Sequence, residues 1–168
     1  MKLNFLMVLT VFMLQSQFAS AEPLRLQRDG PIARDYMNKL EWMRCSIGQV
    51  WEDETCIGEV KMLSVAEAEE VIKRIEGQMG GGWRLPTTKE LQGLVSDAEI
   101  PPKIDVETFP KTYAGSYWSS DQSFYAKHYQ WTVNFYTGYL YNRFFRYQKN
   151  AVRLVRDYIS RCNIIQPI

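Results

Sequence analysis

The sequence predicts an α+β domain, in which two helices come before an antiparallel sheet. Two observations predict the helices, because Ser64 with Glu67 and Thr87 with Glu90 are capping boxes followed by apolar residues at helical spacing. A third observation predicts the sheet, since apolar and polar residues alternate through residues 129–135 and further strand-forming runs follow. Helices followed by strands, rather than alternating with them, favour the α+β class.

The segment from Gly80 to Leu94 organises the predicted domain. Its three leading glycines can take positive φ at little steric cost, so they end the first helix near this point. We expect Trp83 and Leu85 to enter the core, and Pro86 to hold Leu85 in an extended conformation before the second helix begins. The first helix places an apolar stripe on one face, formed by Val65, Ala68, Val71, Ile72 and Ile75.

The remaining elements are strands and one long irregular loop. We expect strands at residues 40–42, 117–119, 129–135 and 139–145, and a last strand at residues 151–155 that closes the late sheet. The loop covers residues 96–116, which is long for a connection inside a compact domain. Its apolar side chains predict that it packs onto the core, namely Ile100, Ile104, Val106 and Phe109.

The 168 residues are enough for about one domain. Residues 1–21 have the form of a signal peptide, with Lys2, an apolar run and a small-residue cleavage site before Glu22. We therefore expect export to the periplasm or the cell surface. We also expect no transmembrane segment after cleavage. The expected organisation is a lead-in segment at residues 22–38, a domain at residues 39–158 and a tail at residues 159–168.

The cysteines are interpreted in the light of export to an oxidising compartment. Cys45 and Cys56 are eleven residues apart, which is too far for a CxxC motif and suits a small disulfide loop with Trp51 inside it. Cys162 is then the odd cysteine. It can pair between chains, stay free or displace one of the other two.

The formal net charge is +1, but the charges are unevenly distributed. Residues 22–102 hold 10 basic and 15 acidic side chains, a net charge of −5, whereas residues 103–168 hold 9 and 4, a net charge of +5. The positive half can attract an acidic partner. The pattern does not resemble a nucleic-acid-binding footprint.

No motif predicts catalysis, a cofactor or a metal. His128 is the only histidine, and no sequence feature marks a nucleophile, an orienting acid and an oxyanion hole around it. The acidic residues of the late loops lack the spacing of a calcium site; they are Asp97, Glu99, Asp105, Glu107 and Asp121. We therefore expect a protein that is not an enzyme.

A binding face is predicted where aromatic and basic residues interleave near the end of the late sheet. Half or more of these rings are expected to be core or cross-strand packing, and the outward ones give flat faces for sugars or apolar side chains. Arg143 and Arg146 are three residues apart on a strand, so one basic patch requires a bend near Phe144 and Phe145. With that bend, an acidic glycan would meet the expected site residues Tyr141, Arg143, Arg146, Tyr147 and Lys149.

Several motifs occur together in a fixed order. They are MRCSIGQVWEDETCIG, GGWRLPTTKEL, IDVETFP, SYWSSD, WTVNFYTG and VRLVR. This series resembles the bacterial domain family named after the C-terminal domain of the Legionella collagen-like adhesin, over about residues 40–157. The resemblance implies a C-type-lectin-like fold and a surface or periplasmic setting, and it carries over no catalytic residue.

Together these features predict a secreted, non-enzymatic binding module for a glycan or a protein partner at the cell surface. The alternative is a structural or assembly component of an envelope complex or surface appendage. The sequence leaves the oligomeric state open.

Overall fold

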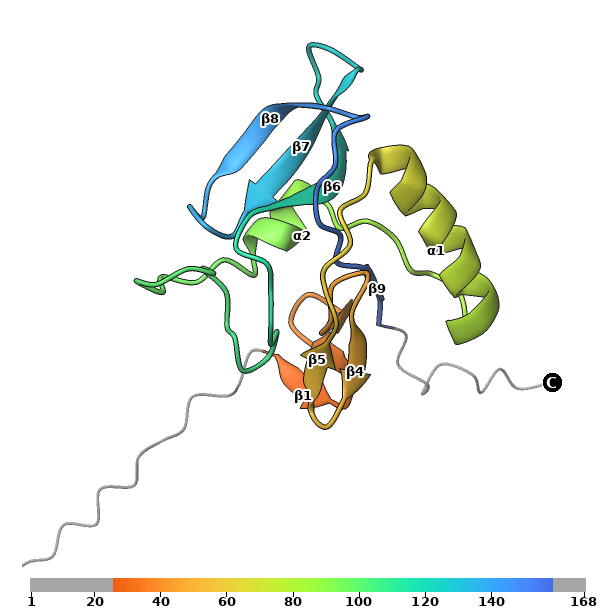
Figure 1. The fold of residues 1–168 in the computed structure, drawn as a ribbon, viewed down its shortest axis with the longest axis vertical. Helices are drawn as coiled ribbons and strands as arrows, with labels where there is room; N and C mark the ends of the chain where they lie inside the picture. Colours follow the sequence, from red (N-terminus) through yellow and green to blue (C-terminus); the bar gives the residue numbers. More distant parts are fainter. Residues whose placement is uncertain (1–25, 159–168) are drawn as a thin grey trace, which may run out of the picture.

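The computed structural model describes residues 26–158, so the predicted signal peptide and the C-terminal tail with Cys162 lie outside the described residues. Eleven elements in this range form an α+β fold whose strand pairs are antiparallel. The three-stranded sheet lies at one end of the molecule, the two-stranded sheet at the other and the longer helix along one side (Figure 1). Within residues 26–158, no helix is long and apolar enough to cross a membrane.

The first sheet joins the beginning and the end of the described chain. Its strands are β1 (Gln27–Asp29), β2 (Ile32–Asp35), β3 (Leu40–Met43) and β9 (Val155–Asp157), in the order β1-β2-β3-β9. The sheet therefore begins upstream of residue 39, where we expected the domain to start, because β1 and β2 form a hairpin that pairs with β3.

The last strand differs from the sequence prediction. Residues 151–155 were expected to close the late sheet, but Val155 pairs with Trp42 of β3 and Ala151 makes an isolated parallel bridge with Tyr117. The chain after residue 150 therefore crosses from the late sheet to the first one. This crossing links the two sheets through backbone hydrogen bonds, including Trp118 N to Ala151 O at 3.0 Å.

A small hairpin carries the predicted disulfide. It consists of β4 (Val50–Glu52) and β5 (Thr55–Ile57), and Cys45 is bonded to Cys56 as expected. Trp51 lies half-buried on this hairpin, where the guanidinium carbon of Arg44 lies 4.1 Å from the centroid of its ring. The hairpin is thus tied to the first sheet by the covalent bond and by this cation–π contact.

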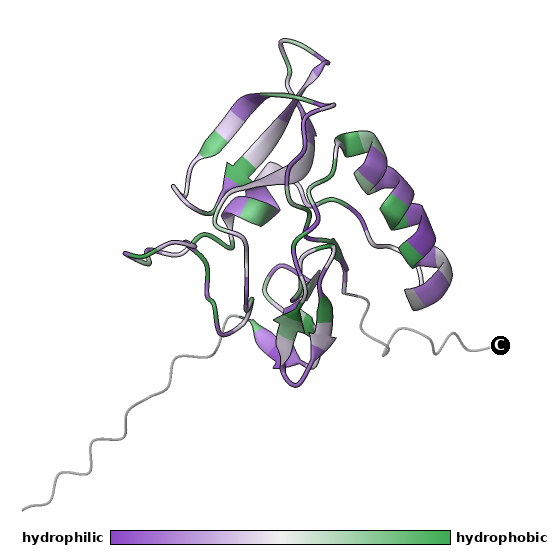
Figure 2. Cartoon of the chain, in the orientation of Figure 1, coloured by the Kyte–Doolittle hydropathy of each residue, from purple (hydrophilic) through white to green (hydrophobic). Residues whose placement is uncertain are grey.

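Both predicted helices are present with both predicted capping boxes. α1 spans Val65–Met79 with Ser64 as its N-cap, and α2 spans Thr88–Gln92 with Thr87 as its N-cap. Figure 2 shows apolar and polar residues interspersed along α1. The buried or half-buried side chains of α1 recur at the predicted helical spacing, so the helix packs through one stripe and exposes its glutamates.

The late sheet is the expected antiparallel meander. Its strands are β6 (Ser116–Gln122), β7 (Tyr129–Asn134) and β8 (Leu140–Phe145), in the order β6-β7-β8. The register shifts between Trp118 and Gln122 on β6. A second shift occurs where β7 meets β8, between Gln130 and Thr132. Irregularities of this kind increase local twist and change the direction of side chains near the end of a sheet.

Two apolar clusters fill the interior. One gathers α2 and the long loop against β3 and the late sheet, and the other gathers α1 against Trp83, Trp118 and Leu154. Trp83 is 2% exposed, as predicted, and the guanidinium carbon of Arg156 lies 4.4 Å from its ring centroid. Trp118 is fully buried, and its Nε1 donates a hydrogen bond to Leu63 O at 2.7 Å.

The long loop is packed down by fewer apolar side chains than expected. Ile104 and Phe109 are buried, whereas Ile100 is 82% exposed and Val106 is 51% exposed, so only half of the predicted anchors reach the core. No pattern in the sequence indicates the anchors that replace them. These are two buried arginines from other parts of the chain.

The first of these arginines is Arg44, which donates from Nε to Thr108 O at 2.7 Å and from Nη2 to Glu107 O at 2.9 Å. The second is Arg153, which is completely buried and donates from Nη2 to Thr112 Oγ1 at 2.8 Å. Burial lowers the pKa of both guanidinium groups. Hydrogen bonds from these buried cations therefore hold the loop in place together with the buried side chains of Ile104 and Phe109.

Candidate functional site

An exposed group of aromatic rings covers the free end of the late sheet. Phe145, the last residue of β8, lies at its centre, with ring centroids 4.6 Å from Tyr129, 5.2 Å from Tyr147 and 5.7 Å from His128. The rings of Phe145 and Tyr147 are nearly parallel, at 17°. The loop between β6 and β7 adds Phe124 and Tyr125, whose rings meet edge to face at 5.6 Å.

We call this surface the aromatic tip and define it by six residues. They are Phe124, Tyr125, His128, Tyr129, Phe145 and Tyr147. The most exposed rings are Phe124 at 93%, Tyr125 at 90% and Tyr147 at 73%. Figure 1 shows the β6–β7 loop projecting beyond the end of the sheet. Phe124 contacts Tyr125, and the other four rings contact one another around Phe145. Exposed neighbouring rings mark an interaction surface more often than isolated ones do.

The backbone of the late sheet positions these rings. Tyr129 and Phe145 are register partners on β7 and β8, so their side chains are direct cross-strand neighbours. The β6–β7 loop is closed by a hydrogen bond from Ser123 N to Tyr129 O at 3.0 Å. After Phe145 the chain turns, with Gln148 N donating to Phe145 O at 2.9 Å, and this turn places Tyr147 over Phe145.

The chain bends after Phe145, as one basic patch containing Arg143 and Arg146 required. However, this bend directs the two later cations towards α1. Arg146 Nη2 lies 3.4 Å from Glu69 Oε1, and Lys149 Nζ lies 3.1 Å from Glu67 Oε1. Arg146 also donates from Nη1 to Gln130 Oε1 at 2.9 Å. Both cations therefore lie beside carboxylates of α1, in ion pairs at the surface of the domain.

The structure therefore divides the five site residues predicted from sequence into two groups. Arg146, Tyr147 and Lys149 line one shallow hollow beside the first turn of α1. Tyr141 and Arg143 lie on β8, outside this hollow. Arg143 is exposed and has no ion pair or hydrogen bond from its side chain to another residue between 26 and 158. It is thus the one cation of the predicted set whose charge is unpaired in this part of the chain.

His128 belongs to the aromatic tip and contacts Tyr129 and Phe145 through its ring. Among residues 26–158, no group of three histidine, cysteine, aspartate or glutamate side chains is placed to hold a metal ion. Two of the dispersed carboxylates accept hydrogen bonds from backbone N–H groups. Asp105 accepts from Glu107 N at 3.0 Å, and Asp121 accepts from Thr88 N at 2.7 Å.

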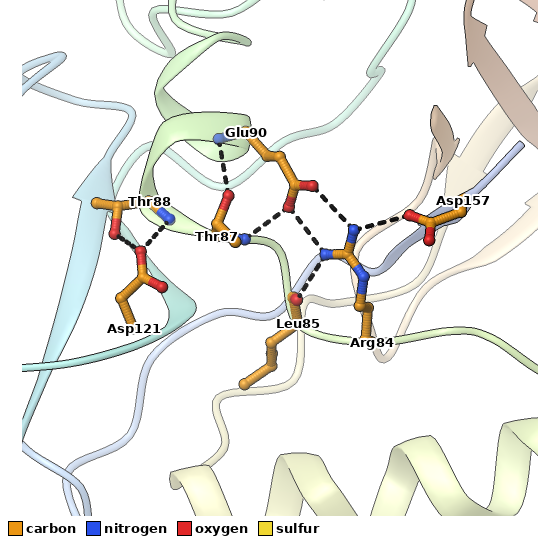
Figure 3. Close-up of polar contacts among 7 residues, drawn as sticks. All are labelled: Arg84, Leu85, Thr87, Thr88, Glu90, Asp121 and Asp157. Carbon is orange, nitrogen blue, oxygen red and sulfur yellow. Dashed lines mark hydrogen bonds and ion pairs between the residues drawn. The ribbon is translucent and has the colours of Figure 1, made fainter. Parts of the chain in front are cut away.

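A separate polar network surrounds the start of α2 (Figure 3). Arg84 donates from Nη1 and Nη2 to the two carboxylate oxygens of Glu90, at 2.9 and 2.8 Å, and from Nη2 to Asp157 Oδ1 at 3.0 Å. Glu90 also accepts from Thr87 N at 2.7 Å. Burial by itself would raise the pKa of Glu90, but these hydrogen bonds outweigh burial and lower it. Glu90 is therefore a charged, fully engaged structural carboxylate.

Comparison with protein families identifies the domain, because the model of the Lcl C-terminal domain matches residues 31–156. The chain belongs to this family. The matched range runs from the end of the β1–β2 turn to β9 and so covers nearly all of the described fold. The match also confirms the resemblance carried by the ordered motifs. A comparison with curated proteins finds no match.

Membership in the Lcl C-terminal domain family indicates a module associated with surface adhesins. Of the aromatic tip, the site residues predicted from sequence include Tyr147 but neither Phe124 nor His128. These residues could have been found from the sequence through the alternation in residues 129–135, which predicts a strand, and the Phe124–Tyr125 pair in the turn before it. Exposed neighbouring aromatics in a hairpin loop are unusual enough to suggest a functional surface.

Proposed function

We propose that this Lcl C-terminal domain is an exported, non-enzymatic binding module that holds a glycan against the aromatic tip. The observation that carries the proposal is the ring cluster centred on Phe145, which presents Tyr147 nearly parallel to it at the end of a hydrogen-bonded sheet. Sugar rings pack against flat aromatic faces, and tyrosine hydroxyls supply hydrogen bonds to their oxygens. We further propose that the fold is C-type-lectin-like, with the late sheet and the long loop on the binding side.

A mutational test separates the aromatic tip from the rest of the sheet. Tyr147→Ala and Tyr125→Ala are each expected to weaken glycan binding by about two- to twelve-fold, equivalent to about 0.5–1.5 kcal/mol per ring contact. Tyr139→Ala is a matched control, because Tyr139 is 70% exposed and lies just before β8, at the opposite end of that strand. On a glycan array, binding should weaken with Tyr147→Ala and with Tyr125→Ala but not with Tyr139→Ala. Equal effects from all three variants would reject the tip as the site.

A second measurement addresses the charge of the ligand. Arg143 is the unpaired cation near the tip, so an acidic glycan should bind Arg143→Ala more weakly than the parent, with a smaller dependence on salt. Arg146→Ala is not a clean variant for this purpose, because Arg146 supports Gln130 and Glu69. A neutral glycan would bind the parent and Arg143→Ala with the same salt curve.

The alternative function is a structural or assembly role in an envelope complex or surface appendage. Phe124 favours it, because a 93% exposed ring without any polar atom is typical of residues that become buried against a protein. Affinity capture from an envelope extract should then retain a single stoichiometric protein with the parent and lose it with Phe124→Ser. Glycan binding that Phe124→Ser leaves intact, together with no such partner, would favour the first function.

A further inference from the structure

The β6–β7 loop carries the two most exposed rings of the aromatic tip. Phe124 is 93% exposed and Tyr125 is 90% exposed, and the loop extends beyond the end of the late sheet (Figure 1). The two rings contact each other edge to face at 5.6 Å, whereas the other four rings of the tip gather around Phe145. The pair therefore forms a unit of its own at the projecting end of the tip.

Backbone hydrogen bonds hold this loop closed. Ser123 N donates to Tyr129 O at 3.0 Å, and Tyr129 N donates to Ala126 O at 2.9 Å. Ser123 is 6% exposed, so the chain is anchored directly before Phe124. The backbone thus presents both rings to solvent. Contact with an apolar phase would remove the free-energy cost of that exposure.

The chain that follows the loop is rich in positive charge. Residues 122–156 contain six lysine and arginine residues and no aspartate or glutamate. The side chains of Lys127 and Arg143 are exposed and make no ion pair or hydrogen bond with another residue between 26 and 158. The other four contact partners within the domain, and they are Arg146, Lys149, Arg153 and Arg156. Unpaired positive charge next to two exposed rings favours a partner that is both apolar and anionic.

An anionic lipid surface combines these two properties. Aromatic side chains are enriched where a bilayer meets water, and lysine and arginine are attracted by negatively charged headgroups. A stable protein interface buries about 800 Å² on each partner. Two aromatic side chains supply only about 300–500 Å². A projecting pair of rings is therefore better suited to entering a lipid layer than to forming a protein interface by itself.

We propose that the β6–β7 loop attaches the domain to the surface of an anionic lipid membrane. Phe124 and Tyr125 enter the layer of lipid headgroups, Lys127 contacts lipid phosphates, and Arg143 adds attraction from β8. The attachment is peripheral, because only the closed loop enters the lipid. This inference goes beyond glycan binding, which is measured with soluble glycans in the absence of lipid, so either proposal can fail without the other.

Co-sedimentation of the full chain with vesicles tests the attachment. Vesicles of phosphatidylcholine mixed with phosphatidylglycerol are compared with vesicles of phosphatidylcholine alone. We expect tighter binding to the anionic vesicles and weaker binding as salt is added. Phe124→Ser should weaken this binding about ten-fold or more, because it removes the apolar ring. Lys127→Ala should weaken it about three- to five-fold.

Two matched controls separate the loop from general stickiness. Tyr139→Ser removes a ring that is 70% exposed and lies just before β8, at the end of that strand away from the tip. Lys61→Ala removes an exposed side chain that is likewise unpaired in residues 26–158. Both controls should bind the anionic vesicles within about two-fold of the parent. Losses equal to those of the loop variants would overturn the proposal.

The depth of the loop is measured with a Phe124→Trp variant and anionic vesicles whose acyl chains carry bromine, which quenches nearby indoles. Fluorescence of this variant should be quenched more strongly than that of the parent, because the added indole enters the lipid. No binding of the parent to anionic vesicles, or no additional quenching in Phe124→Trp, would overturn the proposal. Capture of an envelope protein that depends on Phe124, without vesicle binding, would overturn it in favour of the assembly role.

Discussion

The guanidinium carbon of Arg153 lies 4.6 Å from the centroid of the Phe109 ring, in the interior of the domain. Arg153 is completely buried, and its hydrogen bonds go to backbone carbonyls and hydroxyls, including Met43 O and Arg44 O. It therefore links the strand before the disulfide to the long loop. A buried cation is tolerated here because oxygen atoms and aromatic faces replace its hydration.

Replacing Arg153 should destabilise the fold. Arg153→Met removes the donors and leaves several buried oxygen atoms unpaired, so we expect the free energy of unfolding to fall by about 2–4 kcal/mol. Arg153→Lys should lose somewhat less, because an ammonium group cannot reproduce the planar arrangement of donors. Urea unfolding measures both. Arg143→Met is the exposed control, expected within about 0.5 kcal/mol of the parent. An equal loss of stability in Arg143→Met would contradict the stabilising role of the buried Arg153.

Trp83→Ala should leave a cavity where α1 meets the core. The expected loss is about 3–5 kcal/mol in the free energy of unfolding, because the ring is 2% exposed and packs in the cluster of α1. Thermal and urea unfolding provide the measurement. Met37→Ala, at a position that is 84% exposed, serves as the control. A Trp83→Ala variant that melts within a degree or two of the parent would show that the ring carries little of the packing energy.

The disulfide joins Cys45 and Cys56, which are eleven residues apart in the sequence. Peptide mapping of the unreduced protein should recover these two cysteines in one linked pair. Replacing both with alanine should lower the free energy of unfolding by about 3 kcal/mol on the chain-entropy model. Adding a reductant should lower the stability of the parent but not that of the double variant. Free thiols at both positions, or a bond from either to Cys162, would refute this pairing.

The pKa of Glu67 should be lowered by its contacts in the capping box and with Lys149. The Ser64 backbone N–H, followed by the Lys149 side chain, lowers the pKa of Glu67 from 4.5 to about 2. Because the folded-state pKa is depressed, its contribution to stability is present above about pH 4.5 and is lost as the pH falls towards 2. Carboxyl NMR titration can follow this. Lys149→Ala should raise the pKa of Glu67, whereas Lys61→Ala should not, and a midpoint unaffected by Lys149→Ala would contradict the pairing.

Sequence alone determined the features that depend on residues close together in the chain. The two capping boxes, the α1 stripe, Trp83 in the core and the Cys45–Cys56 bond all follow from short spacings, for which hydrogen-bond geometry and periodicity give a readable signal. The ordered series of motifs also identified the family. The class of the fold followed from the succession of helices and strands.

Only the tertiary structure decided which distant groups meet. Arg146 and Lys149 meet Glu69 and Glu67 at separations of 77 and 82 residues, so these two cations of the predicted site lie beside carboxylates of α1. The last strand joined β3 instead of the late sheet, and the aromatic tip formed around Phe145. The sequence shows which residues are charged or aromatic and so are able to bind. It does not show which residues they contact, because contacts between segments far apart in the chain produce no periodic pattern.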